Sequence, residues 1–73
     1  MSPRLPRISG DEATRALERA GFRRISQRGS HRKLRSDDGR VVIVPLHREL
    51  ATGTLRSIVR QSGLSVEEFL ESL

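Results

Sequence analysis

The sequence contains no cysteine, tryptophan or tyrosine, and its 73 residues include only two phenylalanines. Without cysteine the chain forms neither disulfide bonds nor thiolate metal sites. It also lacks both an apolar run long enough to span a bilayer and a stretch resembling a secretion signal. These absences predict one small cytoplasmic domain with a shallow core, since a chain this short buries only about 60% of the surface that it exposes when unfolded.

Acidic residues are also scarce. The chain has 14 lysines and arginines against nine aspartates and glutamates, a formal net charge of +5, and 13 of those 14 cations are arginine. The planar guanidinium matches phosphate oxygens two at a time, so this composition favours a nucleic-acid partner. A membrane surface is disfavoured, because the main basic run falls on strand-like sequence and not on an amphipathic helix.

Residues 1–7 hold two prolines and two arginines without hydrophobic periodicity. We expect them to form a flexible lead-in, able to touch a polyanion or to hang free in solvent. The remainder, residues 8–73, shows no repeat or low-complexity segment and is expected to fold as a single domain.

A capping box marks the start of the first helix, because the Ser9 hydroxyl can accept from the third helical amide while Glu12 reaches back. Small apolar residues then recur on one face at helical spacing. We place Thr14 with the charged residues on the opposite face, and Gly21 supplies the left-handed stop.

Two further helices are predicted toward the C-terminus. Thr52 is the expected N-cap of the longer one, which carries an apolar stripe and ends at Gly63. Ser65 and Glu68 form a second capping box, which opens a short last helix with Phe69 on its apolar side.

Between the first two helices the pattern changes to that of strands. Residues 22–27 suit a half-buried strand, and a two-residue loop at Arg28–Gly29 would begin a hairpin. Residues 36–39, Ser-Asp-Asp-Gly, are a strong turn signal, and residues 41–44 after them are the most strand-like run in the chain. Because that run is apolar on both faces, we expect it to be the best-covered strand.

A loop at Arg28–Gly29 also assigns the faces of the hairpin. It pairs Ser26 with His31, and it places Ile25 on the same side as Leu34. A shift of the pairing by one residue would reverse this assignment. The polar side would then hold Arg24, Ser26, His31, Lys33 and Arg35.

The predicted order is helix, three antiparallel strands, helix and short helix. We therefore expect an α+β fold in two layers, α-β-β-β-α with a short C-terminal helix, in which the helices cover one sheet face and the other stays open. The stretch from Arg23 to Arg35 contains six cations and no acid, which indicates an anionic partner for the hairpin.

Five motifs, taken together in their order and spacing, resemble the HicA family, the small toxin of HicA/HicB toxin–antitoxin modules. The resemblance covers nearly everything after Arg7. It implies a fold similar to the double-stranded-RNA-binding domain and the activity of a ribosome-independent mRNA interferase, an endoribonuclease that inhibits translation and growth. The motifs are Gly21-Phe22, Gln27-Arg28-Gly29-Ser30-His31, Asp38-Gly39, Val44-Pro45-Leu46-His47, and the stretch from Gly53-Thr54-Leu55-Arg56-Ser57-Ile58 to Gly63-Leu64-Ser65.

The same resemblance implies the site. The histidine of its Gly-Ser-His motif, His31, is the catalytic residue, and Gly29 and Ser30 shape the turn that carries it. The resemblance also implies a HicB-type antitoxin as partner, and we expect that antitoxin to screen His31 with an acidic surface. Leu34 stands where family members sometimes carry an aromatic residue.

RNA cleavage suits these residues, because the substrate carries its own nucleophile, the 2′-hydroxyl. The reaction needs a base for that proton, an acid for the leaving oxygen and cations for the charge on phosphorus, and histidine can take either proton-transfer role. Cations nearby disfavour a charged imidazole, which favours the base role for His31. The expected phosphate contacts are Arg24, Arg28, Arg32, Lys33 and Arg35.

His47 is a candidate auxiliary residue. If the turn at residues 36–39 closes with a three-residue loop, Pro45 lies opposite His31 and His47 lies diagonally beyond it. The alternative is a solvated loop histidine without a role in the reaction.

Other chemistries fit less well. The carboxylate pair Asp37 and Asp38 sits in a turn where aspartate is expected for backbone reasons, so we predict no metal and no other cofactor. Ser30 as a covalent nucleophile lacks a neighbouring acid. A non-catalytic RNA-binding module of the same fold remains the alternative, and it would bind RNA without cleaving it.

Overall fold

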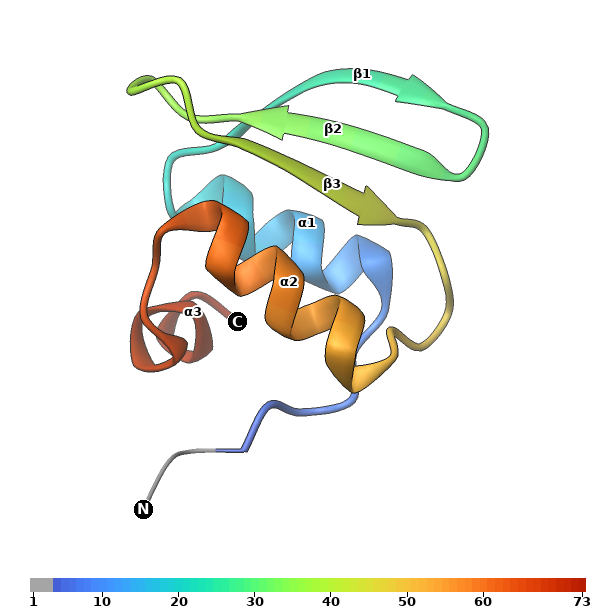
Figure 1. The fold of residues 1–73 in the computed structure, drawn as a ribbon, viewed down its shortest axis with the longest axis vertical. Coiled ribbons are helices and arrows are strands. Elements are labelled where there is room, and N and C mark those ends of the chain that lie inside the picture. Colours follow the sequence, from blue (N-terminus) through green and yellow to red (C-terminus); the bar gives the residue numbers. More distant parts are fainter. Residues whose placement is uncertain (1–3) are drawn as a thin grey trace.

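The structure is a computed structural model that describes residues 4–73; the first three residues of the predicted lead-in lie outside this range. Three helices lie on one side of a three-stranded antiparallel sheet of order β1-β2-β3, and the opposite sheet face is open (Figure 1). This arrangement confirms the predicted two-layer α+β fold. The elements are α1 (Gly10–Arg19), β1 (Arg23–Arg28), β2 (His31–Arg35), β3 (Val41–Pro45), α2 (Thr52–Ser62) and α3 (Val66–Ser72).

α1 begins at the predicted capping box. Ser9 Oγ accepts from the backbone N–H of Glu12, and the Glu12 carboxylate accepts from the N–H of Ser9, each at 3.0 Å. The placement of Thr14 on the exposed face was wrong, because its side chain is fully buried and donates to the carbonyl oxygen of Gly10 at 2.8 Å. Satisfying the hydroxyl within its own helix makes this burial inexpensive.

One hydrophobic core fills the space between the sheet and the helices. α1 contributes alanines as well as leucine, so its backbone can approach the sheet closely. α3 packs mainly against α1, and it contributes Phe69, which is fully buried. The buried apolar residues are Ile8, Ala13, Ala16, Leu17, Phe22, Leu34, Val42, Val44, Leu50, Leu55, Ile58, Val59 and Phe69.

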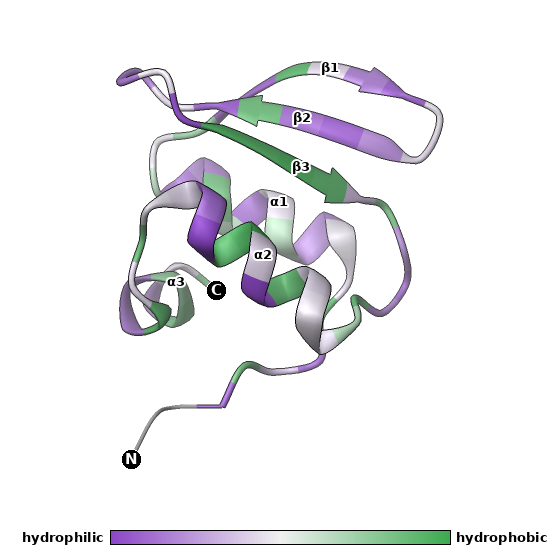
Figure 2. Cartoon of the chain, in the orientation of Figure 1, coloured by the Kyte–Doolittle hydropathy of each residue, from purple (hydrophilic) through white to green (hydrophobic). Residues whose placement is uncertain are grey.

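β3 is apolar along its length (Figure 2), yet it is an edge strand. Val42 and Val44 face the helices and are fully buried, whereas Val41 and Ile43 face outward and remain 42% and 38% exposed. It is nevertheless the best covered of the three strands, as predicted, because two of its residues are buried and Pro45 is half-buried, whereas β1 is exposed throughout. Apolar residues on both faces do not establish a second covering layer, and no helix is left in residues 4–73 to supply one.

The two C-terminal helices follow their predicted signals except at one cap. Ala51, not Thr52, is the N-cap of α2, and among the described residues no side chain makes a capping hydrogen bond at that end. Gly63 ends α2 in the left-handed region with φ 76°, as predicted. The Ser65 and Glu68 capping box of α3 is also present.

The segment before α1 is tied to the loop that follows β3. Leu5 packs against the core and Arg7 pairs with Glu49 at 3.4 Å. The carbonyl of Ile8 accepts from the N–H of Leu50 at 2.7 Å, and the N–H of Gly10 donates to the carbonyl of His47 at 2.9 Å. These bonds fix the loop beside the end of β3. The division of the chain at residues 7 and 8 stays a prediction.

Candidate active site

The turn that carries His31 differs from the predicted one. Arg28 pairs directly with His31, so the two loop residues are Gly29 and Ser30. Gly29 has φ 57° and Ser30 has no positive φ, the pattern of a type II′ hairpin turn with glycine at its first central position. The predicted loop at Arg28–Gly29 was therefore one residue too early. A Gly-Ser pair between strand-like runs was the signal that could have located the turn.

The error moves the pairing of β1 by two residues, and an even shift preserves the faces. Ser26 pairs with Lys33 and shares the open face with His31 and Arg28. The register between β2 and β3 follows the prediction, with His31 opposite Pro45. The N–H of Leu46 donates to the Ser30 carbonyl at 2.7 Å, which anchors the His31 turn to the end of β3.

A β-bulge at Ile25 changes which sheet face Arg24 and Ile25 occupy. Because the bulge adds one residue to this strand, Arg24 pairs with Leu34 and turns to the helix side, where its guanidinium pairs with Glu18 of α1 at 3.2 Å. Ile25 is 51% exposed, so its predicted grouping with Leu34 was wrong. Arg24 accordingly does not share the face of His31.

Arg32 also points away from the open face. Its side chain is only 11% exposed, and its guanidinium donates to Asp11 at 3.1 Å and to Thr14 at 3.2 Å, both on α1. It donates as well to the Gln27 amide oxygen at 3.2 Å on β1. These contacts satisfy a charge that burial would otherwise penalise. Arg32 therefore joins the hairpin to α1.

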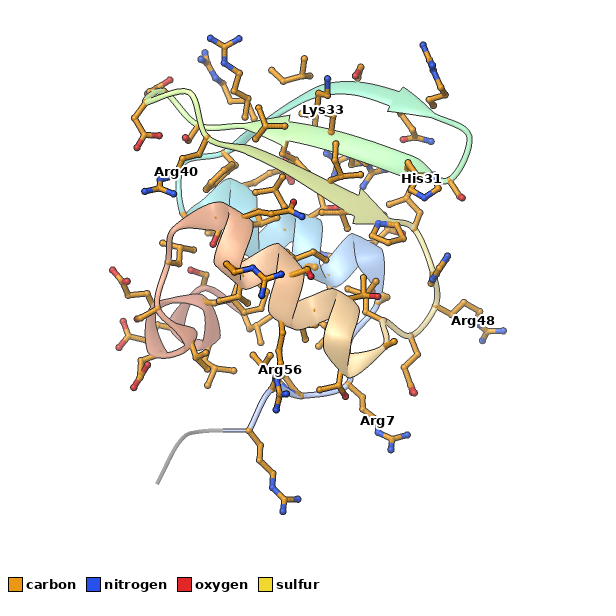
Figure 3. All side chains as sticks on the ribbon, in the orientation of Figure 1. Arg7, His31, Lys33, Arg40, Arg48 and Arg56 are labelled. Carbon is orange, nitrogen blue, oxygen red and sulfur yellow. The ribbon has the colours of Figure 1, made fainter. Side chains whose placement is uncertain are left out.

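The open face keeps three cations whose side chains have no hydrogen-bond or ion-pair partner within residues 4–73: Arg28, Lys33 and Arg35. Figure 3 shows Lys33 rising from the sheet on the side away from the helices, and His31 at the end of the sheet beside the β1–β2 turn. A shallow depression of about 290 Å³ lies between these side chains. Its lining residues are Ser26, Arg28, His31, Lys33 and Ile43.

This depression is electrostatically one-sided. Two of its five lining residues are permanent cations, one is histidine, and none is a carboxylate. His31 is exposed at the start of β2, so a ligand reaches its ring without moving the core. The arrangement can hold a phosphate group against a side chain that transfers protons.

His47 lies in the loop after β3 and is exposed. Its backbone carbonyl accepts from Gly10, but its ring is not among the residues that line the depression. Because His31 pairs with Pro45, the loop that carries His47 begins at the same end of the sheet as His31.

The acidic turn between β2 and β3 is held by a hydrogen bond between its own side chains and by an ion pair to β1. Asp37 pairs with Arg23 at 2.9 Å. Asp38 accepts from the Ser36 hydroxyl, and this hydrogen bond lowers the pKa of the Asp38 carboxyl below its ordinary value. Gly39 closes the turn with φ 89°. Within residues 4–73, no three histidine, aspartate or glutamate side chains gather in a way that could hold a metal ion.

Fold and site together define a small, basic α+β domain whose open sheet face presents a histidine among cations. A family described as the HicA toxin of bacterial toxin–antitoxin systems matches this chain over residues 10–64, from the first residue of α1 to the segment after α2. The protein therefore belongs to the HicA toxin family, and membership implies a cognate antitoxin. No protein of curated function matches the chain at a significant level. In the part of the chain that the structure describes, no helix has the length and apolar character needed to cross a membrane.

Proposed function

We propose that this toxin is an mRNA interferase, a ribosome-independent endoribonuclease that cleaves RNA by metal-independent acid–base catalysis with His31 and so inhibits translation and growth. The observation that carries the proposal is the placement of His31 in a depression with Arg28 and Lys33 and without any carboxylate. The resemblance of the chain to the HicA family supports the same activity.

In this mechanism the ring of His31 takes the proton from a ribose 2′-hydroxyl. The freed oxygen attacks the adjacent phosphorus and forms a 2′,3′-cyclic phosphate, while the bond to the 5′-oxygen breaks and that oxygen takes up a proton. Arg28 and Lys33 stabilise the extra negative charge that develops on phosphorus. Gly29 and Ser30 shape the turn, and His47 is the candidate donor of the second proton.

The phosphate path follows from the observed faces. Arg28, Lys33 and Arg35 project from the open side, and we propose that they contact the RNA backbone. Arg24 and Arg32, which the sequence had grouped with them, are paired with Glu18 and Asp11 on the helix side. The proposed path therefore omits these two arginines.

The proposal is tested with purified protein and a labelled single-stranded RNA in buffer containing EDTA. We expect cleavage to proceed at the same rate with and without EDTA, and to leave 2′,3′-cyclic phosphate ends. Loss of activity in EDTA that returns with a divalent cation would contradict the metal-independent mechanism. Binding without any cleavage under both conditions would favour the alternative, a non-catalytic RNA-binding module.

We further propose that the cognate antitoxin is of the HicB type and covers His31. Arg28 and Lys33, which have no partner in the described part of the chain, call for an acidic partner surface. Charge reversal at both positions, Arg28→Glu with Lys33→Glu, is expected to slow association at least tenfold and to change dissociation less, as measured by surface plasmon resonance. Arg15→Glu, an exposed arginine on α1, is the control. A complex that forms equally fast after the double reversal would contradict occlusion of this face.

A further inference from the structure

Two aliphatic side chains of β3 remain exposed on the same sheet face as His31. Val41 and Ile43 of β3 are 42% and 38% exposed, although their strand neighbours Val42 and Val44 are fully buried. The register places each of them beside a cation of β2, since Ile43 pairs with Lys33 and Val41 pairs with Arg35.

The open face thus has two parallel strips. A basic strip of His31, Lys33 and Arg35 follows β2, and an aliphatic strip of Val41 and Ile43 follows β3. Neighbouring strands lie about 4.8 Å apart, so the strips run side by side. The contrast between the two strands is visible in Figure 2, where β3 is continuously hydrophobic and β2 is mainly hydrophilic.

The aliphatic strip reaches the candidate active site through Ile43. Ile43 is the one apolar residue among the five that line the depression around His31. Since His31 pairs with Pro45, Ile43 lies one diagonal step from His31 across the strand pair. Diagonal neighbours are within reach of long side chains, and a ligand of nucleotide size can touch both.

The edge of β3 at this point is already occupied. The backbone N–H of Ile43 donates to the side-chain oxygen of Gln61 on α2 at 3.1 Å, and Pro45 has no N–H to offer. A protein strand that paired with this edge would have to displace Gln61. The position therefore favours a ligand that approaches the face of the sheet.

We propose that the aliphatic strip receives unpaired bases of the RNA, with Ile43 contacting the base next to the cleaved phosphate, so that Ile43 makes the toxin selective for single-stranded RNA. The inference rests on the proposed function. A single strand can lay its phosphates along β2 and turn its bases onto β3. A duplex keeps its bases stacked inside and can offer only its backbone to these residues.

The test measures binding of a fluorescent single-stranded RNA, and of the same RNA annealed to its complement, to His31→Ala protein by anisotropy at several salt concentrations. Adding Ile43→Ser is expected to weaken single-strand binding about five- to tenfold, which corresponds to one base contact of modest strength. The salt dependence should stay unchanged, because no cation is removed. Lys33→Gln should instead reduce the salt slope by about 0.7, because this variant neutralises one phosphate fewer.

Controls separate the removal of a base contact from damage to the fold. Leu73→Ser removes an apolar side chain of similar exposure, 44%, from the helix layer and should leave RNA binding unchanged. If Ile43→Ser lowers the thermal stability, Ile43→Thr takes its place in the test. Threonine keeps the β-branched shape, and this variant should also weaken single-strand binding.

Equal affinity for single strand and duplex would overturn the inference. Unchanged RNA binding in both Ile43 variants would also overturn it. If those variants instead weakened only the complex with the antitoxin, the aliphatic strip would be assigned to a protein interface. None of these results would contradict the proposed endoribonuclease activity. A wild-type protein that cleaves neither RNA, yet loses single-strand affinity on Ile43→Ser, would overturn the proposed function while retaining the base contact.

Discussion

Replacing His31 with alanine is expected to lower the rate of RNA cleavage by about 10²–10⁴-fold, the range typical of removing a general acid or base. The thermal unfolding curve should stay close to that of the wild type. The side chain is exposed on the open face and has no hydrogen-bond partner within residues 4–73, so its removal costs little stability. RNA affinity should persist, because Arg28 and Lys33 remain. The measurements are single-turnover cleavage of labelled RNA and anisotropy with the same RNA.

Two comparisons make this result specific. His47→Ala leaves the depression unchanged, and a smaller loss of cleavage in this variant would identify His47 as the auxiliary donor. In cells, expression of the His31→Ala protein should no longer arrest growth in the absence of the antitoxin. Cleavage at the wild-type rate by folded His31→Ala protein would contradict the catalytic assignment of His31.

The largest effect on stability is expected from Gly10→Ala. A Cβ atom at Gly10 would collide with the carbonyl oxygen of Pro45 and press on Leu46 Cα at 2.8 Å. Both are backbone atoms, so relief requires the chain after β3 to move and strains the bond from Gly10 N–H to the His47 carbonyl. We expect the free energy of unfolding to fall by about 3 kcal/mol or more. In a domain of this size, each kcal/mol lowers Tm by about 4–8 °C, which calorimetry or circular dichroism resolves.

Gly53→Ala is the matched control for that substitution. Gly53 also lies in the first turn of a helix, but no atom of residues 4–73 that could collide stands within 4 Å of the Cβ atom that alanine would add. Alanine is the better helix former, so this variant should be as stable as the wild type or slightly more stable. If Gly10→Ala and Gly53→Ala melted at the same temperature, the close approach of α1 to the end of β3 would not be a constraint on the fold.

The sequence by itself determined the elements and their order. Capping boxes at Ser9 and Ser65 and a left-handed glycine at Gly63 are local signals, because each hydrogen bond or backbone angle involves residues at most a few positions apart. The alternation of buried and exposed side chains along β2 followed from the side-chain period of a strand, and the pairing of His31 with Pro45 followed from the length of the turn. These features were sufficient to predict two layers and an open face that carries His31.

Only the tertiary structure decided which arginines belong to that face. Runs of cations look alike in sequence. A bulge at Ile25 turns Arg24 toward Glu18, and Arg32 is buried against α1, where it pairs with Asp11. Neither event has a local signature, because a bulge and the burial of Arg32 in its partly buried ion pair both depend on what the helix layer places beneath the strands.

The same reason explains Ile43 and Gly10. An apolar strand predicts burial, yet Ile43 is exposed because the fold has helices on one side of the sheet only. A glycine at the start of a helix predicts nothing unusual, yet Gly10 lies against the backbone of a strand end 35 positions away, at Pro45. Contacts between residues distant in sequence are set when the layers pack, and they determine which side chains surround His31.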